Sequence, residues 1–408
     1  MNFQESIDWL YGTQAFGIKL GLENTRRLLA EAGLAEIPEG MEVIHVAGTN
    51  GKGSVCAFSE QILRDAEIKT GLFTSPHLIT YRERIRVKGE MIREETVADI
   101  LSEIREQVAD WEPHPTFFEL SLVLAMRHFS EQGCEVVILE TGMGGRLDST
   151  NAVQSKVSVI TPIGLDHQQW LGETIREIAG EKAGILKPTV PVVVADLHPD
   201  ARDVVGRKAL SLGIPYIEAH PLPGEWELGL AGPHQRENAA LAVEATCRIA
   251  GERLTQEGIQ QSLAATRWPG RFQEVGEKII VDGAHNEAAA KALCQTWQEK
   301  FPNERAHLIF GAAESKAVTE IFRELLPIIG SVTLVPIKSE RRLSVEKMKA
   351  ALLAAGGEEI HVSESENLAS ALEMAQSGKG KTLVAGSLFL IGETLSLLNG
   401  DAFEVSLQ

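Results

Sequence analysis

Cysteine is scarce in this sequence, and no short cysteine motif is present. The 408 residues include four cysteines, which lie far apart in the chain. No two of them have the Cys-x-x-Cys spacing of many zinc and redox sites. We therefore expect structural thiols in a reducing compartment. The four are Cys56, Cys134, Cys247 and Cys294.

Long apolar runs are also missing. A helix needs about 20 consecutive, mainly apolar residues to cross a bilayer, and no run reaches that length. The first six residues lack the basic region followed by an apolar region that typifies a secretory leader. We therefore predict a cytoplasmic protein that does not bind membranes.

Positive charge is in deficit. The chain has 39 Lys and Arg against 57 Asp and Glu, a formal net charge of -18. Nucleic acids and anionic membranes repel such a protein, so neither is expected as a main partner. An anionic ligand must therefore be bound in a local basic pocket.

The chain has neither a low-complexity tract nor a short-period repeat, and its length indicates two domains. A single core rarely grows beyond roughly 250 to 300 residues. The composition, 44% hydrophobic and 24% charged, is that of an ordinary globular protein. Apolar strand patterns alternate with helical patterns along the chain, which predicts an α/β fold with a mainly parallel sheet.

A glycine-rich segment, His-Val-Ala-Gly-Thr-Asn-Gly-Lys-Gly-Ser at 45–54, joins a predicted strand to a predicted helix. Residues 43–47 are mostly branched and apolar, and apolar residues recur at helical spacing over 55–63. Glycines permit a tight turn whose N–H groups point at an anion beside the helix N-terminus, where the helix dipole also favours negative charge. We therefore favour a phosphate site over an ordinary glycine-rich turn.

The side chains of this loop suit a nucleotide. Lys52 would neutralise the β- and γ-phosphates, and a hydroxyl from Thr49 or Ser54 would contact a phosphate or its magnesium. The spacing departs from the standard P-loop motif because Gly53 follows the lysine directly. The candidate ATP-binding residues here are Thr49, Asn50, Gly51, Lys52, Gly53 and Ser54.

Three further predicted strands end at polar residues. The strand at 70–73 runs into Ser75, the strand at 136–140 ends in Glu140, and the strand at 157–160 leads to His167. Ligands of α/β sheets bind beyond the carboxyl ends of strands, and magnesium prefers oxygen ligands. From spacing alone, Glu140 is either a metal ligand or a cap for the glycine-rich loop after it.

Pro269-Gly270 is the strongest break after a long helical region, and we predict the domain boundary there. The N-terminal domain, 1–269, is predicted to be P-loop ATPase-like. The C-terminal domain, 270–408, is predicted to be smaller and Rossmann-like. No Gly-x-Gly-x-x-Gly motif opens its first predicted helix, so a dinucleotide site is disfavoured there.

Six segments in fixed order resemble the folylpolyglutamate synthase and dihydrofolate synthase family of the muramyl-ligase superfamily. The most specific is Gly-Gly-Arg-Leu-Asp-Ser-Thr-Asn at 144–151. The others include the phosphate loop, Thr-Ser-Pro at 74–76, Lys-Ala-Gly-Ile at 182–185, Asp-Gly-Ala-His-Asn at 282–286 and Gly-Ser-Leu-Phe-Leu at 386–390. The resemblance covers nearly the whole chain and implies an ATP-dependent ligase.

The resemblance also implies roles for single residues. Magnesium, in two sites, would be held by Ser75, Glu140, His167 and Lys182. A protonated lysine is no ligand, so Lys182 would act as the carbamate that it forms with CO2. Its small, apolar neighbours favour loss of the proton that this requires. ATP would further contact Asn238, Arg271, Asp282 and His285, and Lys52, His167 and Lys182 would be catalytic.

Substrate contacts are implied in both domains. Arg146 and Asp148 are candidates for the pterin side, and Ser387 for L-glutamate. The stretch from Lys19 to Glu23 resembles one close to the folate site. At Lys316 the chain departs from the Asp-Lys-Asp pattern of relatives. On residue type alone, Asn238 fits a helix cap as well as a nucleotide contact.

The predicted reaction is the joining of L-glutamate to the carboxylate of a folate or dihydropteroate through an acyl phosphate, by a monomer. Two alternatives remain open at this stage. One is a ligase that acts on a cell-wall uridine nucleotide. The other is a nucleotide-driven switch or kinase, which would turn over ATP or GTP without glutamate.

Overall fold

The computed structural model describes residues 1–16, 21–314, 317–339 and 341–404. The chain forms two compact units. The first comprises residues 1–76, 81–229 and 236–266, and the second comprises 77–80, 230–235 and 267–408. Lys19 and Lys316 lie outside the described residues. The boundary at 269/270, as a border between separately folding domains, stays a prediction.

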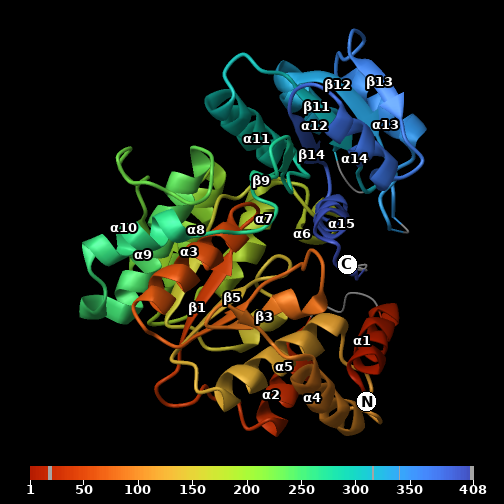
Figure 1. The fold of residues 1–408 in the computed structure, drawn as a ribbon. Helices are drawn as coiled ribbons and strands as arrows, with labels where there is room; N and C mark the ends of the chain where they lie inside the picture. The colour runs from red at the N-terminus through yellow and green to blue at the C-terminus, as the bar shows by residue number, and fades with distance from the viewer. Residues whose placement is uncertain (17–20, 315–316, 340, 405–408) are drawn as a thin grey trace. The chain divides into compact units, whose positions relative to one another are not determined.

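The first unit is built on an eight-stranded sheet with the order β4-β3-β2-β5-β1-β6-β7-β8 (Figure 1). Strands β2 and β5 to β8 run parallel to β1 through successive pairings, whereas β3 pairs antiparallel with β2 and β4 pairs antiparallel with β3. The strands are β1 (Glu42–Ala47), β2 (Thr70–Phe73), β3 (Ile85–Val87), β4 (Glu90–Met91), β5 (Val136–Glu140), β6 (Val157–Ile160), β7 (Val192–Val194) and β8 (Tyr216–Glu218).

Helices cover both faces of this sheet, as expected for parallel strands. They are α1 (Phe3–Gly12), α2 (Glu23–Glu31), α3 (Lys52–Asp65), α4 (Glu94–Gln107), α5 (Phe117–Glu131), α6 (Gln168–Leu171), α7 (Ile175–Lys182), α8 (Pro199–Leu212), α9 (His234–Ala250) and α10 (Gln256–Ala265). The main α/β alternation is that predicted from the sequence. Strand β8 begins at Tyr216, directly after Pro215, and pairs with β7.

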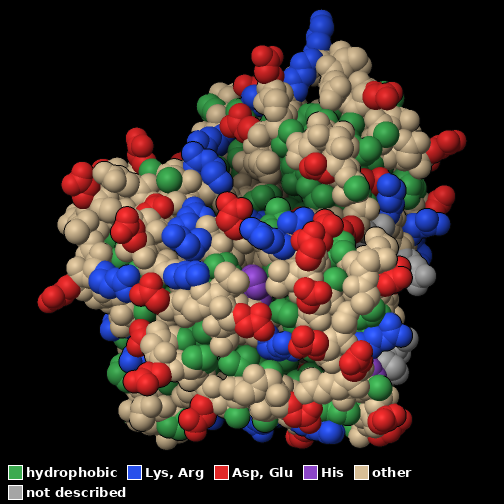
Figure 2. Space-filling model, turned by 60° about the horizontal axis from the view of Figure 1, so that its bottom comes forward, with side chains coloured by type: hydrophobic (Ala, Val, Ile, Leu, Met, Phe, Trp, Pro, Cys, Tyr) green, Lys and Arg blue, Asp and Glu red, His purple; other side chains and the backbone are tan. Residues whose placement is uncertain are grey.

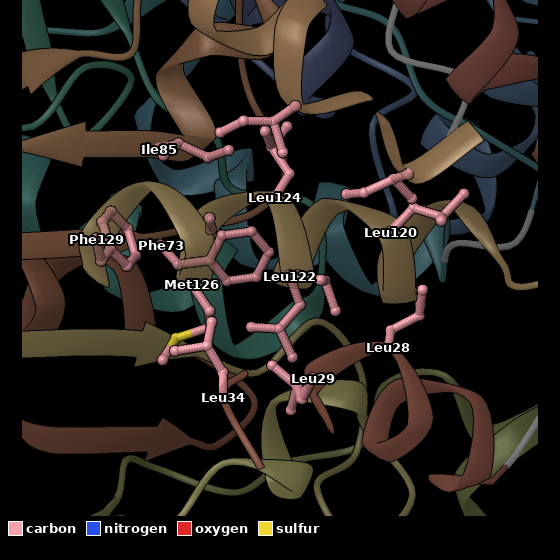
Figure 3. Packing of buried hydrophobic residues seen from close by; sticks show 14 of the residues in the cluster. Leu28, Leu29, Leu34, Phe73, Ile85, Leu120, Leu122, Leu124, Met126 and Phe129 are labelled. Carbon is pink, nitrogen blue, oxygen red and sulfur yellow. The ribbon is translucent and has the colours of Figure 1, made fainter. Parts of the chain in front are cut away.

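One face of the first sheet packs on a core of aliphatic and aromatic side chains (Figure 3). Phe73 comes from β2, Leu28 and Leu29 come from α2, and α5 contributes Leu120 to Phe129. Helix α5 is buried nearly all round because it packs against α2, α4 and β2. Each large apolar side chain buried in this core contributes about 1.5–3 kcal/mol to folding.

The second unit has a six-stranded sheet with the order β13-β12-β11-β14-β10-β9. Only the pairing of β9 with β10 is antiparallel among these strands. The strands are β9 (Gln273–Val275), β10 (Ile279–Val281), β11 (Ala306–Phe310), β12 (Ile329–Leu334), β13 (His361–Glu364) and β14 (Thr382–Ala385). The helices are α11 (Glu287–Lys300), α12 (Val318–Leu325), α13 (Val345–Ala354), α14 (Leu368–Ser377) and α15 (Leu388–Asn399).

Strand side chains of the second unit divide between two cores. Ile280 packs in one cluster, with Leu308 and Leu383, while Ile279 and Val281 pack in the other. This alternation follows from the two-residue period of a strand. It explains why short, continuous apolar runs such as 279–281 form strands covered on both faces.

The face shown in Figure 2 has no large patch of a single charge sign. Acidic and basic side chains are interspersed there (Figure 2). Within the described residues, no helix is both long and apolar enough to cross a membrane. The four cysteines are free thiols.

Candidate active site

The glycine-rich loop connects the central strand β1 to α3. Its N-cap residue, Gly51, has a φ of 87°, a left-handed conformation that favours glycine. A Cβ at this position would lie 2.3 Å from Oδ1 of Asn238, a buried residue of α9. At Gly48 a Cβ would lie 1.8 Å from Oγ1 of Thr161. Both glycines are therefore needed for close packing of the loop against its neighbours.

The loop is anchored to the segment that follows β6. The Thr49 hydroxyl accepts from the N–H of Gly164 and lies within hydrogen-bonding distance of its carbonyl, both at 3.1 Å. Thr161 donates its hydroxyl to the carbonyl of Asn50 at 2.7 Å. The N–H of Thr49 donates to Pro162 at 2.9 Å. These contacts use Thr49 and Asn50 to fix the loop.

Two lysines converge on one carbonyl of this loop. Lys52 donates to the carbonyls of Gly48 and Thr49, each at 3.2 Å. Lys182, at the end of α7, donates to Gly48 at 2.7 Å and is 4% exposed. Burial, followed by repulsion from Lys52, lowers the pKa of Lys182 to about 7. The amine can therefore lose its proton near neutral pH.

Polar groups from neighbouring strands gather at the same edge of the sheet. Register places Val46 opposite Glu140, so β5 ends level with β1. The Glu140 carboxylate is buried and accepts from the N–H of Ser75 at 3.1 Å. His167 has a left-handed φ of 51° and a side chain that is 47% exposed. Its Nε2 lies 4.0 Å from Oδ1 of Asp166.

A metal site is not complete as the side chains stand. In the described part of the chain, no group of three or more His, Cys, Asp and Glu residues is placed to hold a metal ion. Glu140 and the adjacent Ser75 fit a hard cation as oxygen donors. Lys182 in its ordinary form does not fit, because an ammonium group has no lone pair.

The loop after β5 is held by its own residues and by α7. The Arg146 guanidinium forms an ion pair with the Glu181 carboxylate at 2.8 Å, and the backbone N–H of Arg146 donates to the backbone carbonyl of Glu181 at 2.7 Å. Asp148 is buried and accepts from the N–H groups of Met143 and Thr150 at 2.9 and 3.0 Å. Burial raises the pKa of Asp148, against the effect of these hydrogen bonds.

The candidate residues of the second unit lie around the end of β10. The Asp282 carboxylate accepts from the N–H groups of Phe272 and Ala284 at 2.8 and 2.9 Å. Burial raises the pKa of Asp282, and Arg271 opposes that rise. The Nδ1–H of His285 donates to the Gly283 carbonyl at 2.7 Å.

Ser387 is the N-cap of α15, buried, and its hydroxyl accepts from the N–H of Phe389 at 3.2 Å. The structure thus gives this serine a local role, and its predicted contact with L-glutamate stays a prediction. Asp282, His285 and Arg271 belong to the same unit as Ser387.

Sequence reasoning missed several residues of these sites. Thr161 and Glu181 act through contacts with residues more than 30 positions away in the chain. Burial, with repulsion from Arg271, lowers the pKa of His234 to about 4. Its position in Gly-Pro-His-Gln, just before Asn238, was the only signal in the sequence.

A nucleotide loop beside a buried carboxylate, in a chain with a second α/β unit, is the arrangement of an ATP-dependent ligase of the Mur type. Residues 46–204 match the Mur ligase middle domain, and residues 270–388 match the Mur ligase glutamate ligase domain.

Within that class, the chain belongs to the folylpolyglutamate synthase and dihydrofolate synthase family. It is 33% identical to the dihydrofolate synthase/folylpolyglutamate synthase of Bacillus subtilis, over 96% of this chain and 98% of the relative. The family resemblance predicted from the motifs is confirmed.

Solved structures of proteins from this family are similar to the chain over nearly its whole length. Folylpolyglutamate synthase of Mycobacterium tuberculosis, complexed with ADP and AMPPCP, is similar with a TM-score of 0.87 and 27% identity, covering 98% of this chain and 100% of that one. Escherichia coli FolC, in complex with DHPP and ADP, has a TM-score of 0.85 and 28% identity, covering 97% and 98%.

Proposed function

We propose that the protein joins L-glutamate to the carboxyl group of a folate, and also to that of dihydropteroate, at the expense of ATP. One observation carries the proposal. The glycine-rich loop, the Lys52 ammonium group, the buried Lys182 side chain and the Glu140 carboxylate lie around the carboxyl ends of β1, β5 and β6. That edge can bind a triphosphate and stabilise the charge that moves during phosphoryl transfer.

The reaction has two steps. A carboxylate oxygen of the acid attacks the γ-phosphorus of ATP, and ADP leaves, which gives an acyl phosphate. The amine of L-glutamate then attacks the acyl carbon, loses a proton and expels phosphate. Neither step needs a covalent bond to the protein. Positioning and charge neutralisation supply the rate enhancement, as in other phosphoryl transfers.

Roles for single residues are part of the proposal. Backbone N–H groups at the start of α3 bind the phosphates, and Lys52 neutralises the β- and γ-phosphates. We assign Asn238, Arg271, Asp282 and His285 to the nucleotide. Arg146 and Asp148 are assigned to the pterin side, and Ser387 to L-glutamate.

Ser75, Glu140, His167 and a carbamylated Lys182 would hold magnesium, in two sites. Magnesium supplies positive charge to the transferring phosphoryl group. The pKa of about 7 supports carbamylation, because the free amine of Lys182 attacks CO2 and releases one proton. The resulting carbamate is an anionic oxygen ligand in place of a cation.

Carbamylation can be observed without activity. In buffer with 13C-labelled bicarbonate at pH 8, the wild-type protein should show a carbamate carbon resonance. Lys182→Met should lack that resonance, and Lys187→Met should keep it. The control is matched because Lys187 is also shielded from solvent, which lowers its pKa to about 8. Identical spectra for all three proteins would exclude carbamylation of Lys182.

The function itself is tested by phosphate release. ATP turnover is measured with and without L-glutamate, dihydropteroate or tetrahydrofolate, and a uridine-nucleotide muramyl substrate. We expect turnover that requires both L-glutamate and a pterin acid. Glutamate-independent turnover would support a switch or kinase, and turnover with the uridine nucleotide would place the protein in the cell-wall branch.

Two further properties complete the proposal. The four free thiols suit a cytoplasmic protein. We also infer a monomer, for which light scattering should give the chain mass of 44.4 kDa.

A further inference from the structure

An imidazole lies in the middle of the strand that leads into the phosphate loop. His45 is fully buried on β1, between the equally buried Ile44 and Val46. Its Nε2 lies 2.8 Å from the hydroxyl of Thr150. Its Nδ1 is buried and has no hydrogen-bond partner among the described residues. An unpaired buried polar atom costs about 1–3 kcal/mol, a cost that an aliphatic side chain would avoid.

The direction of the hydrogen bonds in this cluster can be derived. The Thr150 hydroxyl also contacts Oδ1 of Asp148, which accepts the Thr150 N–H as well. Both oxygens of Asp148 accept backbone N–H groups, as an ionised carboxylate does. Such a carboxylate cannot donate, and a hydroxyl has a single hydrogen. Thr150 therefore donates to Asp148 and must accept from His45. This requires a hydrogen on Nε2, as in the neutral Nε2–H tautomer.

Burial favours the same state of the ring. It lowers the pKa of His45 well below the usual value, and nearby Lys187 lowers it further. The ring is therefore uncharged at neutral pH. The hydrogen on Nε2 is then retained for Thr150.

The third member of the chain holds a loop. Oδ2 of Asp148 accepts from the N–H of Met143, while Oδ1 binds Thr150, so one carboxylate joins the two ends of the segment 143–150. Asp148 also caps the short helix η3 (Ser149–Ala152). The orientation of this carboxylate therefore sets the conformation of the loop that follows Glu140.

We propose that His45 and Thr150 are positioning residues that fix the Asp148 carboxylate, and with it the loop that receives the pterin end of the acid substrate. This inference rests on the proposed function, because it assigns the loop to that substrate. Neither residue is a catalytic residue. Since His45 precedes Gly48 by three positions, one strand supports both the phosphate loop and the substrate loop.

Kinetics with matched variants test the positioning role. Thr150→Val should raise KM for dihydropteroate and tetrahydrofolate about tenfold or more, with KM for ATP changed less than about twofold. Thr150→Ser, which keeps the hydroxyl, should stay within about threefold of wild type. The control is Thr246→Val, since Thr246 is equally buried but bonds only within α9. It should leave both KM values unchanged.

The imidazole is tested in the same way. His45→Leu should raise KM for the pterin acid as much as Thr150→Val does, and the double variant should be no worse than either single variant. His45→Gln can place an amide N–H near the position of Nε2 and should restore most of the lost affinity. Equal losses in His45→Gln and His45→Leu, or additive losses in the double variant, would overturn the proposal.

A spectroscopic measurement separates this inference from the proposed function. Nitrogen NMR of protein labelled in histidine, with His45→Gln used for assignment, should show hydrogen on Nε2 and a bare Nδ1 for His45. Hydrogen on Nδ1 would overturn the relay, whatever the enzyme's substrate. If the spectrum is as expected but no pterin acid supports turnover, the function assigned to the loop fails while the hydrogen-bond chain stands.

Discussion

The two units each place a turn between a strand and a helix, but they hold it differently. Helix α3 follows β1 through Gly51, which has no side chain with which to cap the helix. Helix α11 follows β10 through Asn286, whose side chain accepts from the N–H of Ala289 at 2.9 Å. The first turn of α3 can therefore bind an anion, whereas that of α11 is partly occupied by its own chain.

The charges around the two turns also favour an anion at the first turn and not at the second. Lys52 and Lys182 converge on Gly48 in the first unit. The turn of the second unit is tied together by the carboxylate of Asp282. The comparison teaches that the same α/β design provides an anion site in the first unit, built from backbone N–H groups and the Lys52 ammonium group, and a turn fixed by side chains in the second unit.

The largest effect is expected from removing the cation of the first turn. Lys52→Met should lower kcat/KM for ATP by about 10²–10³-fold, because a preorganised charge at the transferring phosphate is lost. Steady-state kinetics measure this. Lys156→Met is the control, since Lys156 pairs with Glu42 and is 58% exposed, and it should lose less than twofold. Equal losses would show that the first turn is not the anion site.

A side chain on the loop should give the next largest effect. In Gly51→Ala, a methyl group would meet Asn238 in a left-handed backbone conformation. We expect KM for ATP to rise about 10-fold to 100-fold, corresponding to about 1.4–2.7 kcal/mol. Gly213→Ala has similar backbone strain, with a φ of 63°, but open space around the Cβ. It should lower stability by about 1 kcal/mol and leave KM unchanged.

Enzyme activity should fall at low pH because Lys182 becomes protonated. Its folded pKa of about 7 lies below the value of a free lysine, so protonation is largely complete at pH 6. Because only the free amine takes up CO2, activity should fall about tenfold per pH unit below 7 and recover on adding bicarbonate. A rate profile from pH 5.5 to 8.5 measures this, with CO2-free buffer as the control. Activity indifferent to bicarbonate at every pH would contradict the assignment.

The smallest effect is expected at the second turn. Asn286→Ala removes the cap of α11 and should lower the free energy of unfolding by about 1 kcal/mol. Asn367→Ala removes the equivalent cap of α14, whose side chain accepts from the N–H of Ser370 at 2.9 Å, and should cost as much. Chemical denaturation compares the two variants. A loss of ATP affinity in Asn286→Ala alone would show that the helix cap also positions the nucleotide contacts assigned to Asp282 and His285.

Much of the fold could be predicted because buried parallel strands are continuous apolar runs. The strands at 70–73, 136–140 and 157–160 were predicted with the bounds that the structure gives. The antiparallel strands β3, β4 and β9 were missed. They are short and partly exposed, so neither apolar runs nor clear alternation marks them.

The site could be predicted only where a local pattern carries it. The glycine-rich loop could be predicted because a strand, glycines, a lysine and a helix follow one another in the sequence. The tether from Thr161 to Asn50 joins residues 111 positions apart, and His45 meets Thr150 across 105 positions. Such pairs depend on which strands become neighbours, which no local pattern determines. Lys182 likewise has an ordinary helical context, and only its burial distinguishes it.

The most direct test of the central claim follows an oxygen atom. Dihydropteroate or tetrahydrofolate is prepared with 18O in the reacting carboxyl group, and the phosphate released during glutamate ligation is examined by mass spectrometry. An acyl phosphate formed at the β1 loop predicts that each phosphate carries one oxygen from that carboxyl group. Phosphate that carries oxygen from water alone would contradict it.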